Sequence, residues 1–271
     1  MPTQRTTNTH PSDVWAQGAG YERYVGRWSR LIADEFLKWI AIPHGQVWLD
    51  LGCGTGALSQ RILERHAPAH LVGIDSSDGF VSHARAQITD QRAEFRVGDA
   101  RSLPVSDRAF DAAVSGLVLN FVPDQPKAVA EMRRATRPGG KIAVYVWDYA
   151  GDMQLIRRFW DAAIALNPAA RDFDEGIRFP VCRPEPLRAL FASAGLRDVA
   201  TNAIDVPMAF ENFDDYWSPF LDGQGPAPGY CMSLPEEDRI ALREHLRTSL
   251  PTNRDGKIRL IARAWAVQGV V

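Results

Sequence analysis

The chain has 271 residues, and its 31 lysines and arginines almost balance its 33 aspartates and glutamates, so the formal net charge is −2. This balance argues against a general nucleic-acid binder, which usually carries a basic excess. Three cysteines are too few for a disulfide scaffold and favour a reducing compartment, which we expect to be the cytoplasm. No apolar run approaches about 18 residues, and no Cys/His cluster has zinc spacing, so we expect neither a membrane span nor a metal.

The N-terminal region combines a polar start with one helical pattern. Residues 1–13 are polar and are predicted to be flexible, and they lack the basic start and apolar run of a secretory signal. Residues 14–44 form a lead-in segment, in which apolar side chains recur at helical spacing over 28–41. Pro43 and Gly45 are expected to end this helix.

Residues 45–147 alternate short apolar runs with helical patterns. The expected strands are 47–51, 71–74, 95–97, 111–115 and 141–147. Helices between successive strands imply parallel pairing, because a parallel connection needs about a dozen residues. The strands are apolar without alternation, as expected when helices cover both faces. A doubly wound α/β sheet follows, with ligands bound beyond the carboxyl ends of its strands.

The remaining chain is less regular. Strand patterns recur at 199–210 and 257–267, whereas 148–184 and 211–255 have the character of two insertions rich in aromatic side chains. No repeat or low-complexity linker divides the chain, so we expect a single domain over 1–271. Aromatic, nearly neutral insertions favour a small apolar or aromatic molecule over a polyanion.

The strongest local signal lies between the first strand and the following helix, where residues 50–57 have the sequence D-L-G-C-G-T-G-A. Glycines permit a tight turn and let backbone N–H groups approach a ligand, and a helix N-terminus favours negative charge. Gly52, Gly54 and Ala57 fit the dinucleotide pattern G-x-G-x-x-G/A, and Asp75 follows at the end of the second strand. Taken alone, this loop does not distinguish a nicotinamide cofactor from other cofactors that contain a ribose.

Three further runs accompany the later strands: G-D-A at 98–100, F-D-A-A-V-S at 110–115 and R-P-G-G-K at 137–141. Together with the glycine loop, they resemble class I S-adenosylmethionine-dependent methyltransferases, in particular the small-molecule branch of the ubiquinone/menaquinone-biosynthesis type. The resemblance covers residues 20–147. It implies S-adenosylmethionine as the cofactor and a seven-stranded, mostly parallel Rossmann-like sheet with an antiparallel last strand and lid insertions.

The resemblance also implies cofactor-binding roles. Asp50 would receive the cofactor ammonium, Asp75 the ribose diol and Asp99 the adenine amino group, while Tyr24 or Arg27 would reach the carboxylate. Two serines flank the adenine position, where many relatives carry a bulkier apolar residue. The full set of implied cofactor-binding residues is Tyr24, Arg27, Asp50, Gly52, Cys53, Gly54, Gly56, Asp75, Ser76, Ser77, Asp99, Ala100, Ser115 and Leu117.

Methyl transfer is an in-line displacement for which the protein supplies alignment and a dry site, and a base is needed only if the nucleophile must lose a proton. No histidine falls at the carboxyl end of a predicted strand, so Asp148 and Tyr149, just past the fifth strand, are the candidate catalytic residues. The candidate acceptor-binding residues are Tyr21, Trp28, Asn120, Trp147, Phe179 and Trp217. The predicted function is methyl transfer to an O or C atom of a small, apolar or aromatic acceptor, with no nucleic-acid or membrane partner.

Two alternatives use the same features. An NAD(P)-dependent oxidoreductase would also use the glycine loop and Asp75, although the long segment before the first strand and the R-P-G-G run argue against it. A non-catalytic S-adenosylmethionine-binding protein could have the same fold, since a fold does not fix a function.

Overall fold

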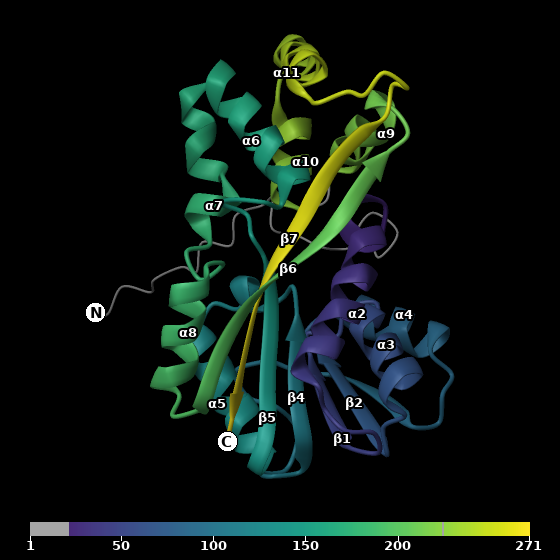
Figure 1. The fold of residues 1–271 in the computed structure, drawn as a ribbon, viewed down its shortest axis with the longest axis vertical. Coiled ribbons are helices and arrows are strands. Elements are labelled where there is room, and N and C mark those ends of the chain that lie inside the picture. The colour runs from purple at the N-terminus through teal and green to yellow at the C-terminus, as the bar shows by residue number, and fades with distance from the viewer. Residues whose placement is uncertain (1–21, 224) are drawn as a thin grey trace, which may run out of the picture.

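The computed structural model describes residues 22–223 and 225–271 (Figure 1). They form a 7-stranded sheet in the order β3-β2-β1-β4-β5-β7-β6. The strands are β1 (Val47–Leu51), β2 (His70–Asp75), β3 (Ala93–Val97), β4 (Phe110–Gly116), β5 (Thr136–Trp147), β6 (Arg197–Phe210) and β7 (Ile258–Val270). The first five strands pair in parallel, and β7 is antiparallel to both β5 and β6. The predicted mostly parallel sheet with an antiparallel last strand is therefore confirmed.

Amphipathic helices cover the sheet. They are α2 (Arg27–Ile40), α3 (Ala57–His66), α4 (Asp78–Gln87), α5 (Gln125–Ala135) and α8 (Pro184–Ser193). Figure 1 shows α2, α3 and α4 grouped away from α5 and α8, and α2 packs on α3 while α5 packs on α8. In α2, the predicted spacing buries Ile32, Phe36 and Ile40 on one face.

The two insertions meet beyond the carboxyl end of the parallel strands. The first contains α6 (Gln154–Leu166), η4 (Pro168–Phe173) and α7 (Glu175–Arg178); the second contains α9 (Phe213–Trp217), η5 (Ser218–Asp222), α10 (Pro226–Ser233) and α11 (Glu236–Ser249). Helix α6 packs against both α10 and α11. We call this assembly the cap. It lies along the part of β6 and β7 that continues past β5 as a two-stranded ribbon (Figure 1).

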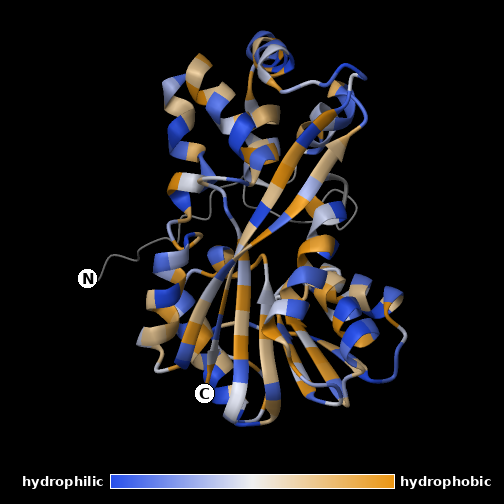
Figure 2. Ribbon diagram, viewed as in Figure 1, coloured by the Kyte–Doolittle hydropathy of each residue, from blue (hydrophilic) through white to orange (hydrophobic). Residues whose placement is uncertain are grey.

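One hydrophobic cluster joins the sheet, the cap and the lead-in. The ring of Phe159 in α6 stacks on Phe220 in η5, with centroids 4.5 Å apart. Tyr24, in the π-helical segment η2 (Glu22–Gly26), meets the same Phe220 ring edge-on at 5.6 Å. Figure 2 shows hydrophobic residues along β4 and β5 and alternating along β6. None of the helices in the described ranges is long and apolar enough to cross a membrane.

Candidate active site

The glycine loop turns at the carboxyl end of β1 and needs its glycines. The backbone N–H groups of Gly52 and Cys53 both donate to the carbonyl of Ile74 at the end of β2. Gly52 has a φ of +71°, and a Cβ there would collide with the Val118 side chain, whereas Gly54 has a φ of +53° with open space around it. The loop is therefore packed against the protein at Gly52 and open toward a ligand at Gly54.

Gly56 closes the loop at the start of α3. It has a φ of +90°, and a Cβ at this position would lie 2.6 Å from Ile88 Cδ1. Its N–H donates to the carbonyl of Cys53, which is the residue that begins the turn. Gly56 therefore shapes the loop from behind and is not among the described residues that line the site.

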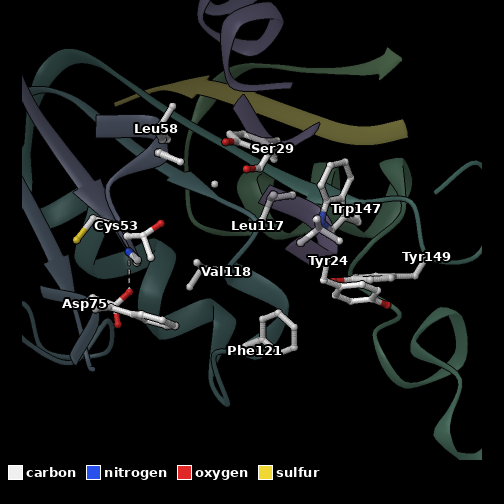
Figure 3. A pocket seen from close by; sticks show the side chains of 18 of the residues that line it. Tyr24, Ser29, Cys53, Leu58, Asp75, Leu117, Val118, Phe121, Trp147 and Tyr149 are labelled. Atoms are coloured by element: carbon white, nitrogen blue, oxygen red, sulfur yellow. Dashed lines mark hydrogen bonds between the residues drawn. The ribbon is translucent and has the colours of Figure 1, made fainter. Parts of the chain in front are cut away.

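Asp75 links the ends of β1 and β2. Its Oδ2 accepts from Gly54 N at 3.0 Å, drawn as a dashed line in Figure 3, and its Oδ1 accepts from Ser77 N at 2.9 Å. Burial raises the pKa of Asp75, although these backbone donors oppose the shift. A carboxylate has about four lone-pair sites, so acceptor capacity is left for ribose hydroxyl groups.

Asp50 is a fully buried carboxyl beneath the loop. Its Oδ2 accepts from Ser59 Oγ at 2.6 Å, while its Oδ1 has no hydrogen-bond partner among the described residues. Burial raises its pKa to about 7, and the Asp75 charge adds to the shift. A buried carboxylate oxygen without a partner fits a site completed by a cationic or water ligand.

A groove beside the loop collects the residues predicted to surround an adenine. Its lining includes Asp75, Ser76, Ser77, Asp99 and Ala100. Phe80, on the first turn of α4, lines the same groove and supplies the apolar surface that the two serines lack. Asp99 is held by Arg101, with Oδ2 and Nη2 2.7 Å apart, and this partner lowers its pKa to about 2. Asp99 is therefore an ionised acceptor at the groove edge.

Next to this groove lies a cavity whose wall is mainly apolar and aromatic, as is typical of small-molecule sites. The two hollows share Gly52, Asp75, Phe80, Val118 and Phe121, so they form one continuous site. The cavity walls come from residues between 24 and 175, and Figure 3 shows the lead-in, the loop and the ends of β4 and β5 around the cavity. Its further lining residues include Tyr24, Cys53, Gly54, Leu117, Tyr145, Trp147, Tyr149, Ile156 and Glu175.

The carboxyl end of β4 turns abruptly into the cavity. Leu117 has a φ of +62°, a region that non-glycine residues seldom adopt, and its N–H donates to the carbonyl of Tyr145 at 2.8 Å. Leu117 and the following Val118 thereby line the site. Two predicted residues are buried outside the lining: Ser115, on β4 two residues before Leu117, and Asn120, in the 3-10 turn η3 (Leu119–Phe121). The described residues offer no partner to the polar atoms of these two side chains.

Several sequence-predicted residues stand away from the cavity. Arg27 pairs with Asp215 of α9 at 3.1 Å and lies over the rings of Trp28 and Phe210. Its guanidinium is therefore engaged elsewhere, contrary to the expectation that it reaches the cofactor. Trp28 itself packs on Phe210, with ring centroids 5.1 Å apart.

The other outlying residues belong to the cap and the end of β5. Trp217 stacks against Phe213, and Phe179 packs behind the lining, 5.1 Å from the Phe121 ring and 5.8 Å from that of Tyr149. Asp148 is buried and accepts from Asp152 N at 2.9 Å, so it organises the turn after β5 without lining the cavity. Tyr21 lies outside the described residues.

Glu175 is a site residue that the sequence patterns did not predict. This residue begins α7, is 1% exposed and lines the cavity, and the Nε1–H of Trp160 donates to its carboxyl group. Burial raises its pKa to about 8. The same burial, with the Glu175 charge second, raises the pKa of Tyr24. No local pattern marks Glu175, because it is one of several acids in an irregular insertion.

Comparison with known proteins extends this picture. Residues 49–144 match a family profile described as a methyltransferase domain. A ubiquinone/menaquinone biosynthesis C-methyltransferase of Dinoroseobacter shibae is 34% identical over 42% of this chain and 48% of its own length. A demethylmenaquinone methyltransferase of Renibacterium salmoninarum is 38% identical over 44% of this chain and 46% of its own length. The chain thus spans about half the length of the curated relatives it matches.

Solved structures agree at the level of the fold. Phosphoethanolamine N-methyltransferase 2 of Haemonchus contortus, in complex with S-adenosyl-L-methionine, has a TM-score of 0.59 at 15% identity, covering 94% of this chain and 57% of that one. The YcgJ protein of Bacillus subtilis has a TM-score of 0.55 at 17% identity, covering 89% and 97%. At such identities the likeness shows the fold alone.

Proposed function

The chain carries a class I S-adenosylmethionine-dependent methyltransferase domain, and on that premise we propose that it transfers a methyl group from S-adenosylmethionine to an oxygen or carbon atom of a small, apolar or aromatic acceptor. One observation carries the proposal. The glycine loop and Asp75 border a groove that continues into an aromatic cavity at the carboxyl ends of the strands. A donor and an acceptor can therefore meet within one site.

The residues of the groove fit the donor. The cofactor supplies an electrophilic methyl group on a sulfonium, and the protein supplies position and dryness. Gly52, Cys53 and Gly54 would lie along its amino-acid part, with Gly56 holding the turn and Asp50 offering its unpartnered oxygen to the ammonium. The remaining proposed cofactor residues are Asp75, Ser76, Ser77, Asp99 and Ala100 at the nucleoside, and Tyr24 and Leu117 near the methyl group, while Ser115 is buried on β4 outside the lining.

The cavity fits an uncharged acceptor. No lysine, arginine or histidine is among its described lining residues, so a carboxylate or phosphate on the acceptor would have no cation to meet. Trp147, Tyr145, Tyr149 and Phe121 supply flat apolar walls. Relatives named for ubiquinone, menaquinone and demethylmenaquinone support an acceptor with an aromatic ring. Of the predicted acceptor residues, we retain Trp147 as a direct contact, and Tyr149, which was predicted as catalytic, lines the cavity beside it.

Residues from the lead-in to the first insertion line the cavity, and the second insertion contacts the lead-in through Phe220 and Tyr24. We propose one methyltransferase domain, with the lead-in covering the donor, residues 45–147 binding it and the two insertions enclosing the acceptor. Tyr24 and Glu175 line the same cavity, which supports this arrangement. We also propose that the protein works in the cytoplasm without a nucleic-acid partner, which its three free, buried cysteines and its near-neutral charge support.

Binding and turnover assays test the function. Calorimetry with S-adenosylhomocysteine and with NADH should show binding of the former only. Transfer of labelled methyl from S-adenosylmethionine is then measured on 1-naphthol, 1,4-dihydroxynaphthalene and 1-naphthylamine. No binding of S-adenosylhomocysteine at millimolar ligand overturns the proposal. Binding without transfer to any broad acceptor panel supports the non-catalytic alternative instead.

A further inference from the structure

Glu175 is a buried acid at the acceptor end of the cavity. It belongs to the first insertion, whereas Asp75, the other carboxylate in the lining, is tied to the donor end by Gly54 and Ser77. The Trp160 indole holds one carboxyl oxygen, Oε2, from the cap side. The backbone N–H of Glu175 also contacts its carboxyl group, and Glu175 lines the cavity, so this carboxyl group borders a molecule bound there.

The described residues that line the cavity beside Glu175 offer no positive charge to balance an ionised carboxyl group. Tyr24 from the lead-in and Tyr149 after β5 line the same cavity, and neither carries a positive charge. Asp174, the preceding residue, is bound by Arg157 at 2.9 Å and 3.0 Å, which satisfies that carboxylate separately.

Two further titratable groups lie on the cap side of Glu175. Arg178, on the same short helix, lies over the Phe179 ring at 5.2 Å. Its charge lowers the pKa of Glu175 only weakly against the rise caused by burial. The Cys182 thiol is buried and stays protonated, because burial raises its pKa. A carboxyl group in this setting is costly when charged, so its presence in a cavity wall points to chemistry.

We propose that Glu175 is the general base of the reaction and that the acceptor is an aromatic molecule bearing a hydroxyl group, whose proton Glu175 takes. The inference rests on the proposed methyltransferase function and assigns its acceptor class. An apolar cavity with a single acid at its far end matches a flat ring with one or two hydroxyl groups. Glu175 replaces Asp148 as the proposed catalytic residue, because Asp148 is absent from the described lining.

For transfer to oxygen, Glu175 removes the hydroxyl proton, and the freed oxygen electron pair forms the new bond to the methyl carbon. The carbon–sulfur pair remains on sulfur, and Glu175 then releases its proton to water. For transfer to a ring carbon, conjugation places the nucleophilic pair on that carbon, which afterwards loses its own proton as the hydroxyl group re-forms. In both cases the acceptor loses one proton in total.

The decisive variant is Glu175→Gln, because a glutamine oxygen still accepts from Trp160 but cannot take a proton. The matched control is Glu185→Gln, an exposed acid on α8 outside the cavity. Methyl transfer to 1-naphthol and 1,4-dihydroxynaphthalene is measured between pH 6 and 10. We expect E175Q to lower kcat at least about 100-fold and to abolish the rise of kcat with pH, while KM for the acceptor changes little and E185Q behaves as the unmodified protein.

A second readout is independent of turnover. Infrared difference spectra across the same pH range should show a protonated carboxyl group that titrates near pH 8 and is missing in E175Q but present in E185Q. Retention of kcat within threefold in E175Q, or absence of this titration, overturns the role of Glu175. Transfer to 1-naphthylamine but to neither hydroxyl probe overturns the acceptor class. In each case S-adenosylhomocysteine binding together with methyl transfer by the unmodified protein shows separately that the proposed methyltransferase function stands.

Discussion

At the scale of single residues, two buried carboxyl groups dominate the site. Asp50 lies under the glycine loop with a pKa raised to about 7, and Glu175 lies in the cavity wall with a pKa raised to about 8. Both shifts come chiefly from burial, which disfavours the charged form. Each group therefore changes its charge close to neutral pH, and each should leave its own signature on binding or on stability.

Asp50 should make donor binding depend on pH. The cofactor ammonium favours the ionised carboxylate, so below pH 7 binding must first remove a proton from Asp50. We expect the Kd for S-adenosylhomocysteine to rise about tenfold for each pH unit below 7. Calorimetry from pH 5.5 to 8 measures this dependence, and Asp50→Asn should bind weakly with no such slope. A flat profile in the unmodified protein would contradict contact between Asp50 and the ammonium.

Glu175 should make the fold less stable as pH rises. Between the ordinary glutamate pKa of 4.5 and about 8, the unfolded chain releases this proton while the folded protein keeps it, so unfolding becomes more favourable as pH rises. Glu175→Gln removes this loss. The Tm of E175Q should therefore exceed that of the unmodified protein by an amount that grows from pH 5 to pH 8 and then levels off. E185Q is the control, and a constant Tm difference across this range would argue against the buried neutral acid.

At the scale of elements, the effect of the glycine loop on ligand affinity can be separated from the effect of its backbone strain on stability. Gly54 and Gly139 both have positive φ values and open space around them, but only Gly54 lines the cavity. Gly54→Ala and Gly139→Ala should each cost about 1 kcal/mol of folding free energy, measured by urea unfolding. Only G54A should weaken S-adenosylhomocysteine, by about tenfold or more. Equal affinities in the two variants would place the donor away from the loop.

Arg27 joins the lead-in to the cap, and its substitution is a second test at the scale of elements. Its pair with Asp215 is partly exposed, so most of its contribution comes from stacking on Trp28 and Phe210. We expect Arg27→Ala to cost about 1 kcal/mol of stability and to change the Kd for S-adenosylhomocysteine less than twofold. A tenfold loss of affinity would instead support the sequence-based role at the cofactor carboxylate.

At the scale of the whole molecule, the sheet edge where the proposed donor site lies was predictable, whereas the wall of the proposed acceptor site was not. Strand ends and glycine turns are local, so sequence placed Asp75 and Gly54 at the carboxyl edge of the sheet. Glu175 reaches the cavity only because α6, α7 and the lead-in pack together, which no short pattern encodes. Arg27 lies away from the cavity for a related reason: the face of a helix that meets a ligand depends on the tertiary partners around it.

Ligand binding should stabilise the lead-in and the glycine loop together. Because η2 and the glycine loop line one cavity, S-adenosylhomocysteine should slow hydrogen exchange in both. At a ligand concentration of about 100 times Kd, amides that exchange by opening of the site should slow by about 100-fold. Helix α11, at the outer side of the cap, serves as the internal reference. Protection of the glycine loop alone would show that the lead-in does not close over the donor.

The position of β7 between β5 and β6 has a consequence for biosynthesis. β6 has no other neighbour in the sheet, and the ribbon that continues to the cap needs both β6 and β7. A ribosome releases residues 45–147 long before residues 258–270, so the nascent chain can arrange its donor half early. The cap gains its anchored position only when the last strand inserts, and the acceptor cavity is therefore the last part of the molecule to be completed.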